Sequence, residues 1–194
     1  MFDIILASKS KVRLDILNKN NVVCSAKPSN VDEDEIKISM LKEGASPKDV
    51  SKNLAEIKAN KVSQNNLDKI VIGADSVIDL ENEIISKPKN RSEALEILRK
   101  LNGKTHFLIS SVCISKNGSM IWHYTDKAEL KMKTMTEDEL KIYLSKIEDE
   151  KLYAYNVYQI EGEGKNLFNS IKGDMNTIMG LPIKKIKEYL SNLK

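Results

Sequence analysis

The sequence has few cysteines, few histidines and no long apolar run. Its two cysteines, Cys24 and Cys113, lie far apart and lack the CxxC spacing of zinc or redox sites, so we expect free, buried thiols. No apolar run approaches the roughly 20 residues of a membrane-spanning helix. The opening segment MFDIILASKS has no basic leader. These absences predict a cytoplasmic protein without a membrane partner.

A large excess of one charge is also missing. The 31 basic and 28 acidic residues alternate along the chain, which gives a net charge of +3 and no basic stripe, so no nucleic-acid partner is predicted. The motifs GxSxG, HExxH, GxxxxGK[ST] and GxGxxG are absent. The two histidines, His106 and His123, fall in predicted strands, where a structural role is more common than a catalytic one.

Local patterns divide the chain into strands and helices. Expected helices are 8–20, 46–64, 92–101, 136–147 and 181–193; expected strands are 2–8, 21–29, 105–114 and 119–133, with a hairpin in 71–90 that turns at 81–83 and an acidic loop at 30–37. Strand-helix units beside antiparallel hairpins predict an α/β fold with a mixed, twisted sheet flanked by helices. At 194 residues the chain fits a single domain, 1–194, with two lobes as the alternative.

Lys58 is unusual because it shares a helical face with Leu54 and Val62, four residues to either side. A lysine on an apolar stripe either extends its ammonium to water or faces an anion that neutralises it. The sequence leaves both readings open.

Three further charged residues stand near expected element ends. Arg13 lies about one turn into the first helix, Asp75 ends an apolar strand run, and Lys87 precedes Pro88. Singly, they are typical of a surface arginine, a turn cap and a loop lysine. The hairpin between Asp75 and Lys87 is expected to bring the lysine back towards the acid.

Together these residues match the needs of nucleoside triphosphate hydrolysis. Arg13, Lys58 and Lys87 supply cations that offset phosphate charge, while Asp75 and the Asp32-Glu33 pair supply carboxylates for a divalent metal or a water. Spacing alone does not bring them together.

Eight segments occur in an order similar to that of a known family: LASKSKVRLDIL, SNVDEDE, LAEIKANKV, VIGADSVI, ISKPKN, ALEILRKLNGKTH, YQIEGEG and IKGDMNTIMGLP. Over nearly the whole chain the sequence resembles the Maf-type nucleoside triphosphate pyrophosphatases. The resemblance implies an elongated, two-lobed fold related to the inosine triphosphatase-like pyrophosphatases, with a cleft for the nucleotide and a divalent cation, Mg²⁺ or Mn²⁺. It also implies hydrolysis of a nucleoside triphosphate to the monophosphate and pyrophosphate, and suggests a homodimer.

The resemblance also implies residue roles. Asp75 matches the proton acceptor for the attacking water, and the other catalytic matches are Lys58, Lys87 and Glu33. Asp75 and Glu33 are the candidate metal ligands. The substrate-binding matches are Ser8, Ser10, Arg13, Ser76 and Glu161.

Three departures from the family pattern leave the base and the activity open. Lys11-Val12-Arg13 stands where Pro-Arg-Arg is usual, 153–156 replaces Asp-Lys-Ala-Gly, and Glu161 replaces a glutamine. An ionised glutamate only accepts hydrogen bonds, so base recognition should change. A noncanonical or pyrimidine nucleotide is the expected substrate. The alternative is a nucleotide-binding regulator of cell division with weak or no catalysis.

Overall fold

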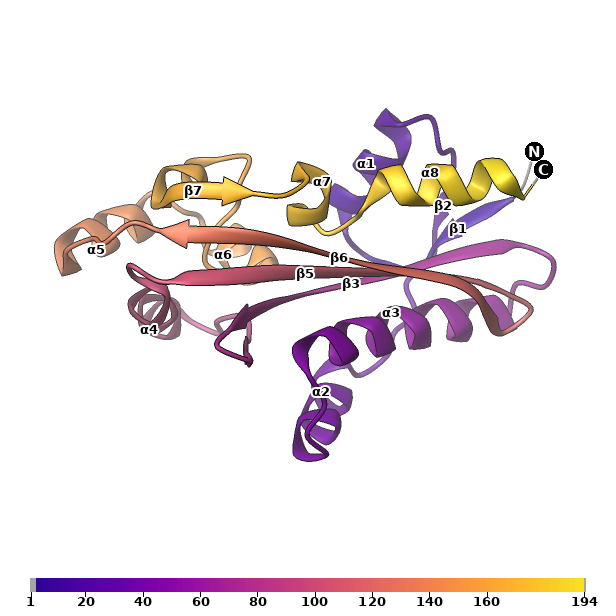
Figure 1. Cartoon of the computed structure of the whole chain (residues 1–194), viewed down its shortest axis with the longest axis horizontal. Helices are drawn as coiled ribbons and strands as arrows, with labels where there is room; N and C mark the ends of the chain where they lie inside the picture. The colour runs from indigo at the N-terminus through magenta and orange to yellow at the C-terminus, as the bar shows by residue number, and fades with distance from the viewer. Residues whose placement is uncertain (1–2, 194) are drawn as a thin grey trace. The chain divides into compact units, whose positions relative to one another are not determined.

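The structure is a computed structural model that describes residues 3–193 (Figure 1). Its strands are β1 (Ile4–Leu6), β2 (Ser25–Ala26), β3 (Ile70–Leu80), β4 (Glu83–Ile85), β5 (Thr105–Lys116), β6 (Ser119–Met132) and β7 (Phe168–Lys172). Its helices are α1 (Lys11–Lys19), α2 (Glu33–Lys42), α3 (Pro47–Gln64), α4 (Arg91–Leu101), α5 (Glu137–Ser145), α6 (Asp149–Tyr155), the 3-10 helix η1 (Glu163–Leu167), α7 (Met175–Ile178) and α8 (Ile183–Asn192).

The strands form one seven-stranded sheet in the order β2-β1-β3-β5-β6-β7, with β4 paired to β3. The pairs β1–β2 and β1–β3 are parallel, whereas β3–β4 and β6–β7 are antiparallel. The predicted α/β class with a mixed sheet and flanking helices is therefore confirmed. In the part of the chain that the structure describes, no helix is both long and apolar enough to cross a membrane.

The described residues divide into two compact units. Unit 1 comprises those up to Val77, Ile109–Lys127, and those from Asp174 on; unit 2 comprises Ile78–Leu108 and Ala128–Gly173. The long strands β3, β5 and β6 contribute residues to both units. That the whole chain is one domain stays a prediction.

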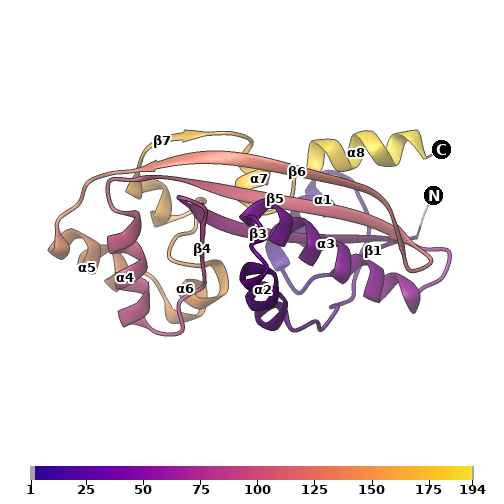
Figure 2. The same cartoon turned by 60° about the horizontal axis from the view of Figure 1, so that its bottom comes forward.

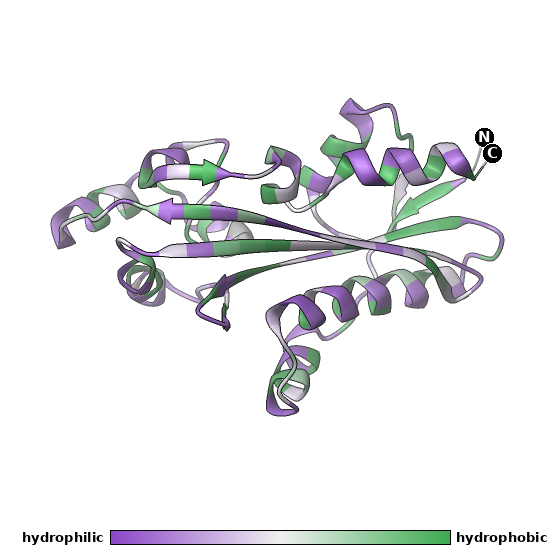
Figure 3. Ribbon diagram, viewed as in Figure 1, coloured by the Kyte–Doolittle hydropathy of each residue, from purple (hydrophilic) through white to green (hydrophobic). Residues whose placement is uncertain are grey.

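The core of unit 1 covers both faces of its strands. On one face, Leu6 and Ile72 belong to a cluster with residues of α1 and α8. On the other face, Ile5 and Val71 pack with Val62 of α3. The two views place α8 and α3 on opposite sides of the strands (Figures 1 and 2), and β1 is drawn as an apolar strand in Figure 3. This alternation decides which helix each residue of β3 meets.

Locally encoded boundaries agree with the predictions. Ser46 caps α3 by accepting from the Asp49 N–H, and Thr136 forms a capping box with Glu139 at the start of α5, where the helices 46–64 and 136–147 were expected to begin. The hairpin between β5 and β6 turns at Asn117 and Gly118, whose φ angles are 52° and 82°. The predicted 71–90 hairpin is present as the β3–β4 pair.

Several other boundaries were predicted wrongly. The acidic loop at 30–37 is instead the start of α2, because Asp32 accepts from the Glu35 N–H and three acids in the first turn favour the positive end of the helix dipole. The expected strand at 21–29 contains only Ser25–Ala26. Helix α4, expected at 92–101, begins at Arg91 and is capped by Asn90. Phe2, expected to begin the first strand, lies outside the described residues.

The two cysteines are both free, but only one is fully buried. Cys113 lies in the core, where burial raises the pKa of its thiol to about 12, so it is unreactive at neutral pH. Cys24 is half-buried, which corrects the expectation of two buried thiols.

Gly73 lets α3 approach β3 closely. A Cβ at this position would lie 2.2 Å from the Ala55 carbonyl O and 2.7 Å from the Ala59 N, both backbone atoms of α3. Backbone cannot yield as the end of a side chain can. The glycine of the GADS segment is therefore required by contact with the helix that carries Lys58.

We expect Gly73→Ala to lower the free energy of unfolding by about 1–3 kcal/mol, because the added methyl group overpacks the α3–β3 contact. Gly162→Ala is the control, since the nearest heavy atom to its Cβ would be 3.8 Å away. Urea unfolding measures both variants. An unchanged Gly73→Ala midpoint would show that α3 can move away without cost.

Unit 2 contains a buried histidine. His106 on β5 is fully buried, and its Nε2 lies 2.9 Å from the Tyr158 hydroxyl. The ring of Tyr158 meets that of Phe168 edge-on at a centroid distance of 4.9 Å. The His106 Nδ1 has no hydrogen-bond partner among the described residues, and burial lowers the pKa of the ring to about 4. The predicted structural role of His106 agrees with this packing, whereas His123 is exposed on β6.

Acid should destabilise the fold through His106. Its pKa of about 4 in the folded chain lies below the ordinary 6.5, so the unfolded state takes up the proton first. The stabilisation by neutral His106 is complete above pH 6.5 and is lost as the pH falls towards 4, by about 3 kcal/mol. Urea unfolding between these pH values should show a smaller decline for His106→Gln than for the wild type or for His123→Gln. An equal decline in all three proteins would contradict the assignment.

Candidate active site

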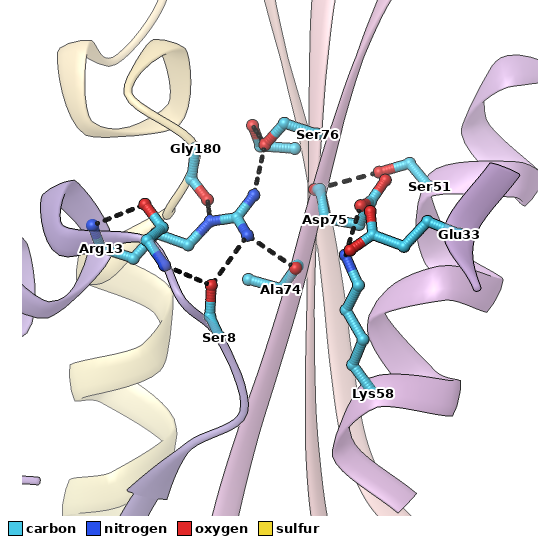
Figure 4. A network of polar contacts seen from close by, with 11 residues as sticks. Ser8, Arg13, Glu33, Ser51, Lys58, Ala74, Asp75, Ser76 and Gly180 are labelled. Carbon is cyan, nitrogen blue, oxygen red and sulfur yellow. Dashed lines mark hydrogen bonds and ion pairs between the residues drawn. The ribbon is translucent and has the colours of Figure 1, made fainter. Parts of the chain in front are cut away.

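The strand β3 presents two successive polar residues to opposite faces (Figure 4). Asp75 points towards α3 and meets Lys58, whereas Ser76 lies on the side of α1 and meets Arg13. The alternation of strand side chains produces this division. All the residues of this site belong to unit 1.

The α3 side holds a buried ion-pair triad. Lys58 Nζ lies 2.8 Å from Asp75 Oδ1 and 2.9 Å from Glu33 Oε1. The Lys58 and Asp75 side chains are each only 6% exposed, whereas that of Glu33 is 42% exposed. Lys58 therefore faces anions and does not extend to water, which resolves the two readings of its sequence position.

The charges of the triad shift the ionisation of Glu33. Burial alone would raise the pKa of Glu33, but the ammonium of Lys58, assisted by Lys37, outweighs burial and holds the pKa below its ordinary value. Burial lowers the pKa of the Arg13 guanidinium against the opposing effect of Asp75 and Glu33. An arginine nevertheless stays charged at neutral pH. The triad thus carries two carboxylates and one ammonium, a net charge of −1.

The triad fits a divalent cation. Asp75 Oδ2 is buried and has no hydrogen-bond partner among the described residues. Carboxylate oxygens suit Mg²⁺ and Mn²⁺, and Mg²⁺ commonly takes only one or two carboxylates and completes its shell with water and phosphate. The described residues contain no cluster of three or more His, Cys, Asp or Glu that could hold a metal alone. Asp75 and Glu33 are accordingly the residues that could hold one.

The backbone around Asp75 is fixed from both faces. The Ser51 hydroxyl on α3 donates to the Asp75 carbonyl at 3.2 Å, and Arg13 Nη1 donates to the Ala74 carbonyl at 2.8 Å. The last backbone hydrogen bond between β1 and β3 runs from the Ala7 N–H to the Ile72 carbonyl. Beyond the end of β1, Arg13 therefore binds the backbone of β3 in its place. Sequence reasoning missed Ser51, because one serine within an amphipathic helix gives no signal of its partner.

Arg13 is held chiefly by the protein itself. Its Nε donates to the Gly180 carbonyl at 3.0 Å, and its Nη2 donates to the Ser76 hydroxyl at 3.2 Å. A weaker contact of 3.5 Å joins Nη1 to Ser8 Oγ. Gly180 has a φ of +95°, and a Cβ there would lie 3.3 Å from Arg13 Nε and Nη2. The arginine therefore fastens α1 to β3 and to the turn before α8.

Ser8 and Ser10 shape the start of α1. Ser8 Oγ accepts from the Ser10 N–H at 3.1 Å, and Ser10 Oγ caps the helix by accepting from the Arg13 N–H at 3.3 Å. Each hydroxyl accepts in these contacts, so its own hydrogen is available for another acceptor. Both serines are thus suited to donate to an anion at the helix start.

Seven of the predicted site residues lie in unit 1: Ser8, Ser10, Arg13, Glu33, Lys58, Asp75 and Ser76. Lys87 and Glu161 belong to unit 2, and their predicted roles stay predictions. Lys87 follows β4. The carbonyl of the preceding residue, Ser86, accepts from Asn156 Nδ2 at 3.4 Å. Glu161 is exposed just before η1.

The fold and site together define an α/β protein with a buried carboxylate-lysine centre beside an arginine-fixed strand. The sequence pattern of the family described as Maf-like protein matches residues 3–193. The chain belongs to the Maf family.

Its relatives are named by activity. The chain is 67% identical to a nucleoside triphosphate pyrophosphatase of Pelagibacter ubique over 99% of this chain and 98% of that one. It is 35% identical to a nucleoside triphosphate pyrophosphatase of a Ruegeria species (96% and 94%) and 37% identical to a 7-methyl-GTP pyrophosphatase of Rhizobium etli (93% and 90%). The likeness to a solved HAM1 protein from Coxiella burnetii has a TM-score of 0.45, an identity of 16% and coverages of 68% and 73%, too weak to carry an argument.

Proposed function

We propose that this protein is a nucleoside triphosphate pyrophosphatase, which hydrolyses its substrate to the monophosphate and pyrophosphate. The observation that carries the proposal is the Lys58-Asp75 pair, in which one carboxylate oxygen meets the ammonium at 2.8 Å and the other has no partner among the described residues. A carboxylate that is oriented through one oxygen and open at the other is suited to accept a proton from water. Membership of the Maf family supports the same activity.

The residues divide the chemistry between proton transfer and charge. Asp75 accepts the proton of the attacking water, and Lys58, at 2.8 Å, orients that carboxylate. Ser8 and Ser10 donate hydroxyl hydrogens to phosphate oxygens, while Arg13 and Lys87 offset the negative charge that develops there. A Mg²⁺ or Mn²⁺ held by Asp75 and Glu33 would supply charge stabilisation for the phosphates when bound.

We assign recognition of the nucleobase to Glu161 and its neighbours. The expected base is noncanonical or a pyrimidine. The carboxylate can accept from a donor on the base edge but cannot donate. We further place the protein in the cytoplasm as a homodimer that removes unwanted nucleotides from the pool.

A second candidate is a nucleotide-binding regulator of cell division with weak catalysis. It is favoured by the engagement of Arg13 with carbonyls of the protein itself, at 2.8 Å and 3.0 Å, together with the lack of a second arginine beside it. Fewer positively charged side chains would then be available to stabilise the negative charge of the transition state. The two candidates differ in turnover and agree in nucleotide binding.

A nucleotide panel with Mg²⁺ or Mn²⁺ tests the proposal. Purified, folded protein is incubated with canonical, methylated and pyrimidine triphosphates, and pyrophosphate is measured. We expect release from at least one member, with an equal amount of the monophosphate. Tight binding without release would favour the regulator, and neither binding nor release would overturn both candidates.

A further inference from the structure

A line of hydroxyl groups runs from Arg13 to α7 within unit 1. Ser76 Oγ lies 3.2 Å from Arg13 Nη2 and 2.8 Å from Ser110 Oγ on β5. Ser110 Oγ in turn lies 2.7 Å from the Thr177 carbonyl O. Ser110 and Thr177 are fully buried. Neither residue was a candidate from the sequence.

The hydrogen positions along this line follow from counting. Each serine hydroxyl has one hydrogen, and a carbonyl oxygen only accepts. Ser110 must therefore donate to Thr177 across their 2.7 Å contact, which leaves Ser76 as the donor in its contact with Ser110. Arg13 can only donate to Ser76. All three hydrogen bonds point the same way, from the guanidinium to α7.

The line closes into a ring through the turn before α8. The Gly180 N–H donates to the Thr177 carbonyl at 3.0 Å, and the Gly180 carbonyl accepts from Arg13 Nε at 3.0 Å. The Thr177 hydroxyl donates to Asp126 at 2.6 Å, which fixes α7 to β6. The guanidinium is thus held at two of its nitrogens by one hydrogen-bonded ring.

We infer that Ser110 and Thr177 are positioning residues for Arg13, and that Ser76 acts through Arg13 without donating to a phosphate. Because its hydrogen is engaged by Ser110, the Ser76 hydroxyl can only accept further hydrogen bonds, and it accepts one from the guanidinium. Arg13 engages four of its five N–H hydrogens with protein atoms. One Nη2 hydrogen remains that no described residue accepts. This inference rests on the proposed function, in which that hydrogen faces the substrate.

Kinetics of matched serine variants test the inference. Ser110→Ala and Ser76→Ala should each lower kcat/KM about tenfold, since a displaced guanidinium also releases the Ala74 carbonyl beside Asp75. The double variant should lose about tenfold and not a hundredfold, because both changes break one line. Ser111→Ala is the control: Ser111 is the next residue, is 1% exposed and bonds Thr125 Oγ1 at 2.9 Å. It should stay within twofold while losing comparable stability to urea.

A measurement without turnover separates this inference from the proposed function. The exchange of the Arg13 Nε–H with water, followed by NMR of ¹⁵N-labelled protein, should accelerate at least about tenfold in Ser110→Ala and remain unchanged in Ser111→Ala. An inactive wild type would contradict the proposed function, and the exchange rates would still decide the positioning role. Unchanged exchange in Ser110→Ala, or a hundredfold loss of kcat/KM in the double variant, would overturn the inference.

Discussion

Replacing Lys58 by methionine is expected to lower the free energy of unfolding by about 3–5 kcal/mol, the cost of breaking a buried pair by removing one partner. Methionine keeps most of the aliphatic stem, so the packing of this α3 side chain changes little. The Asp75 side chain, 6% exposed, would lose the ammonium at 2.8 Å and remain a buried charge. Glu33 is 42% exposed and can turn to water. Urea unfolding at pH 7 measures the effect.

Two further variants give this result its meaning. Lys61→Met lies on the same helix, but Lys61 is exposed and donates to the Asn30 carbonyl, so its loss should stay below about 1 kcal/mol. Adding Asp75→Asn to Lys58→Met removes the unpaired charge and should restore much of the stability. If Lys58→Met were as stable as the wild type, or if the two changes simply added, the pair would not be what neutralises Asp75.

The sequence predicts those parts of the fold whose signals are local. Ser46 before Pro47, and Thr136 with Glu139, mark helix starts because the capping atoms lie within one turn. Asn117 before Gly118 marks a hairpin because the turn itself needs positive φ. Strand β7 was missed, since its pairing partner on β6 lies some 40 residues earlier, as in Glu129 with Lys172. Its own five residues carry no strong alternation.

The acidic run at the start of α2 shows a different failure. Four consecutive acids predict a solvated loop by composition, yet the first of them, Asp32, caps a helix and the next three occupy its first turn. The same residues suit both states. Glu33 also contacts Lys58 at 2.9 Å, which no local pattern reveals, and this interaction stabilises the helical state of the run.

The candidate site was predictable by residue but not by arrangement. Lys58 stood out because it interrupts an apolar stripe, and Asp75 because it follows an apolar strand. The partners of Arg13 could not be read, because the carbonyls of Ala74 and Gly180 are backbone atoms that every residue has. Ser110 could not be singled out either, because it is one of two adjacent serines in a strand. The approach of Lys87 to Asp75 stays a prediction.

Replacing Asp75 by asparagine is expected to lower kcat at least about a hundredfold, the lower end of general-base contributions. Asparagine has nearly the same shape, and Lys58 would keep Glu33 as its partner at 2.9 Å. The Ser51 and Arg13 contacts involve backbone carbonyls and survive the change. The variant loses the ability to accept a proton and one carboxylate charge of the candidate metal site, whereas the fold and nucleotide binding should persist.

Asp79 supplies the matched control. It lies on the same strand, is 7% exposed, and accepts from the Asn82 N–H at the hairpin turn through Oδ1, which an asparagine oxygen can replace. Asp79→Asn should therefore keep kcat within about twofold. The regulator candidate predicts instead that the wild type turns over no faster than Asp75→Asn.

The most direct measurement is pyrophosphate release by the wild type, Asp75→Asn and Asp79→Asn at saturating nucleotide, with the best substrate of the panel and the same divalent metal. The proposed function predicts steady release by the wild type and Asp79→Asn and a loss of about a hundredfold or more in Asp75→Asn. Asp75→Asn within tenfold of the wild type, or an equal loss in Asp79→Asn, would contradict the assignment of Asp75 as proton acceptor.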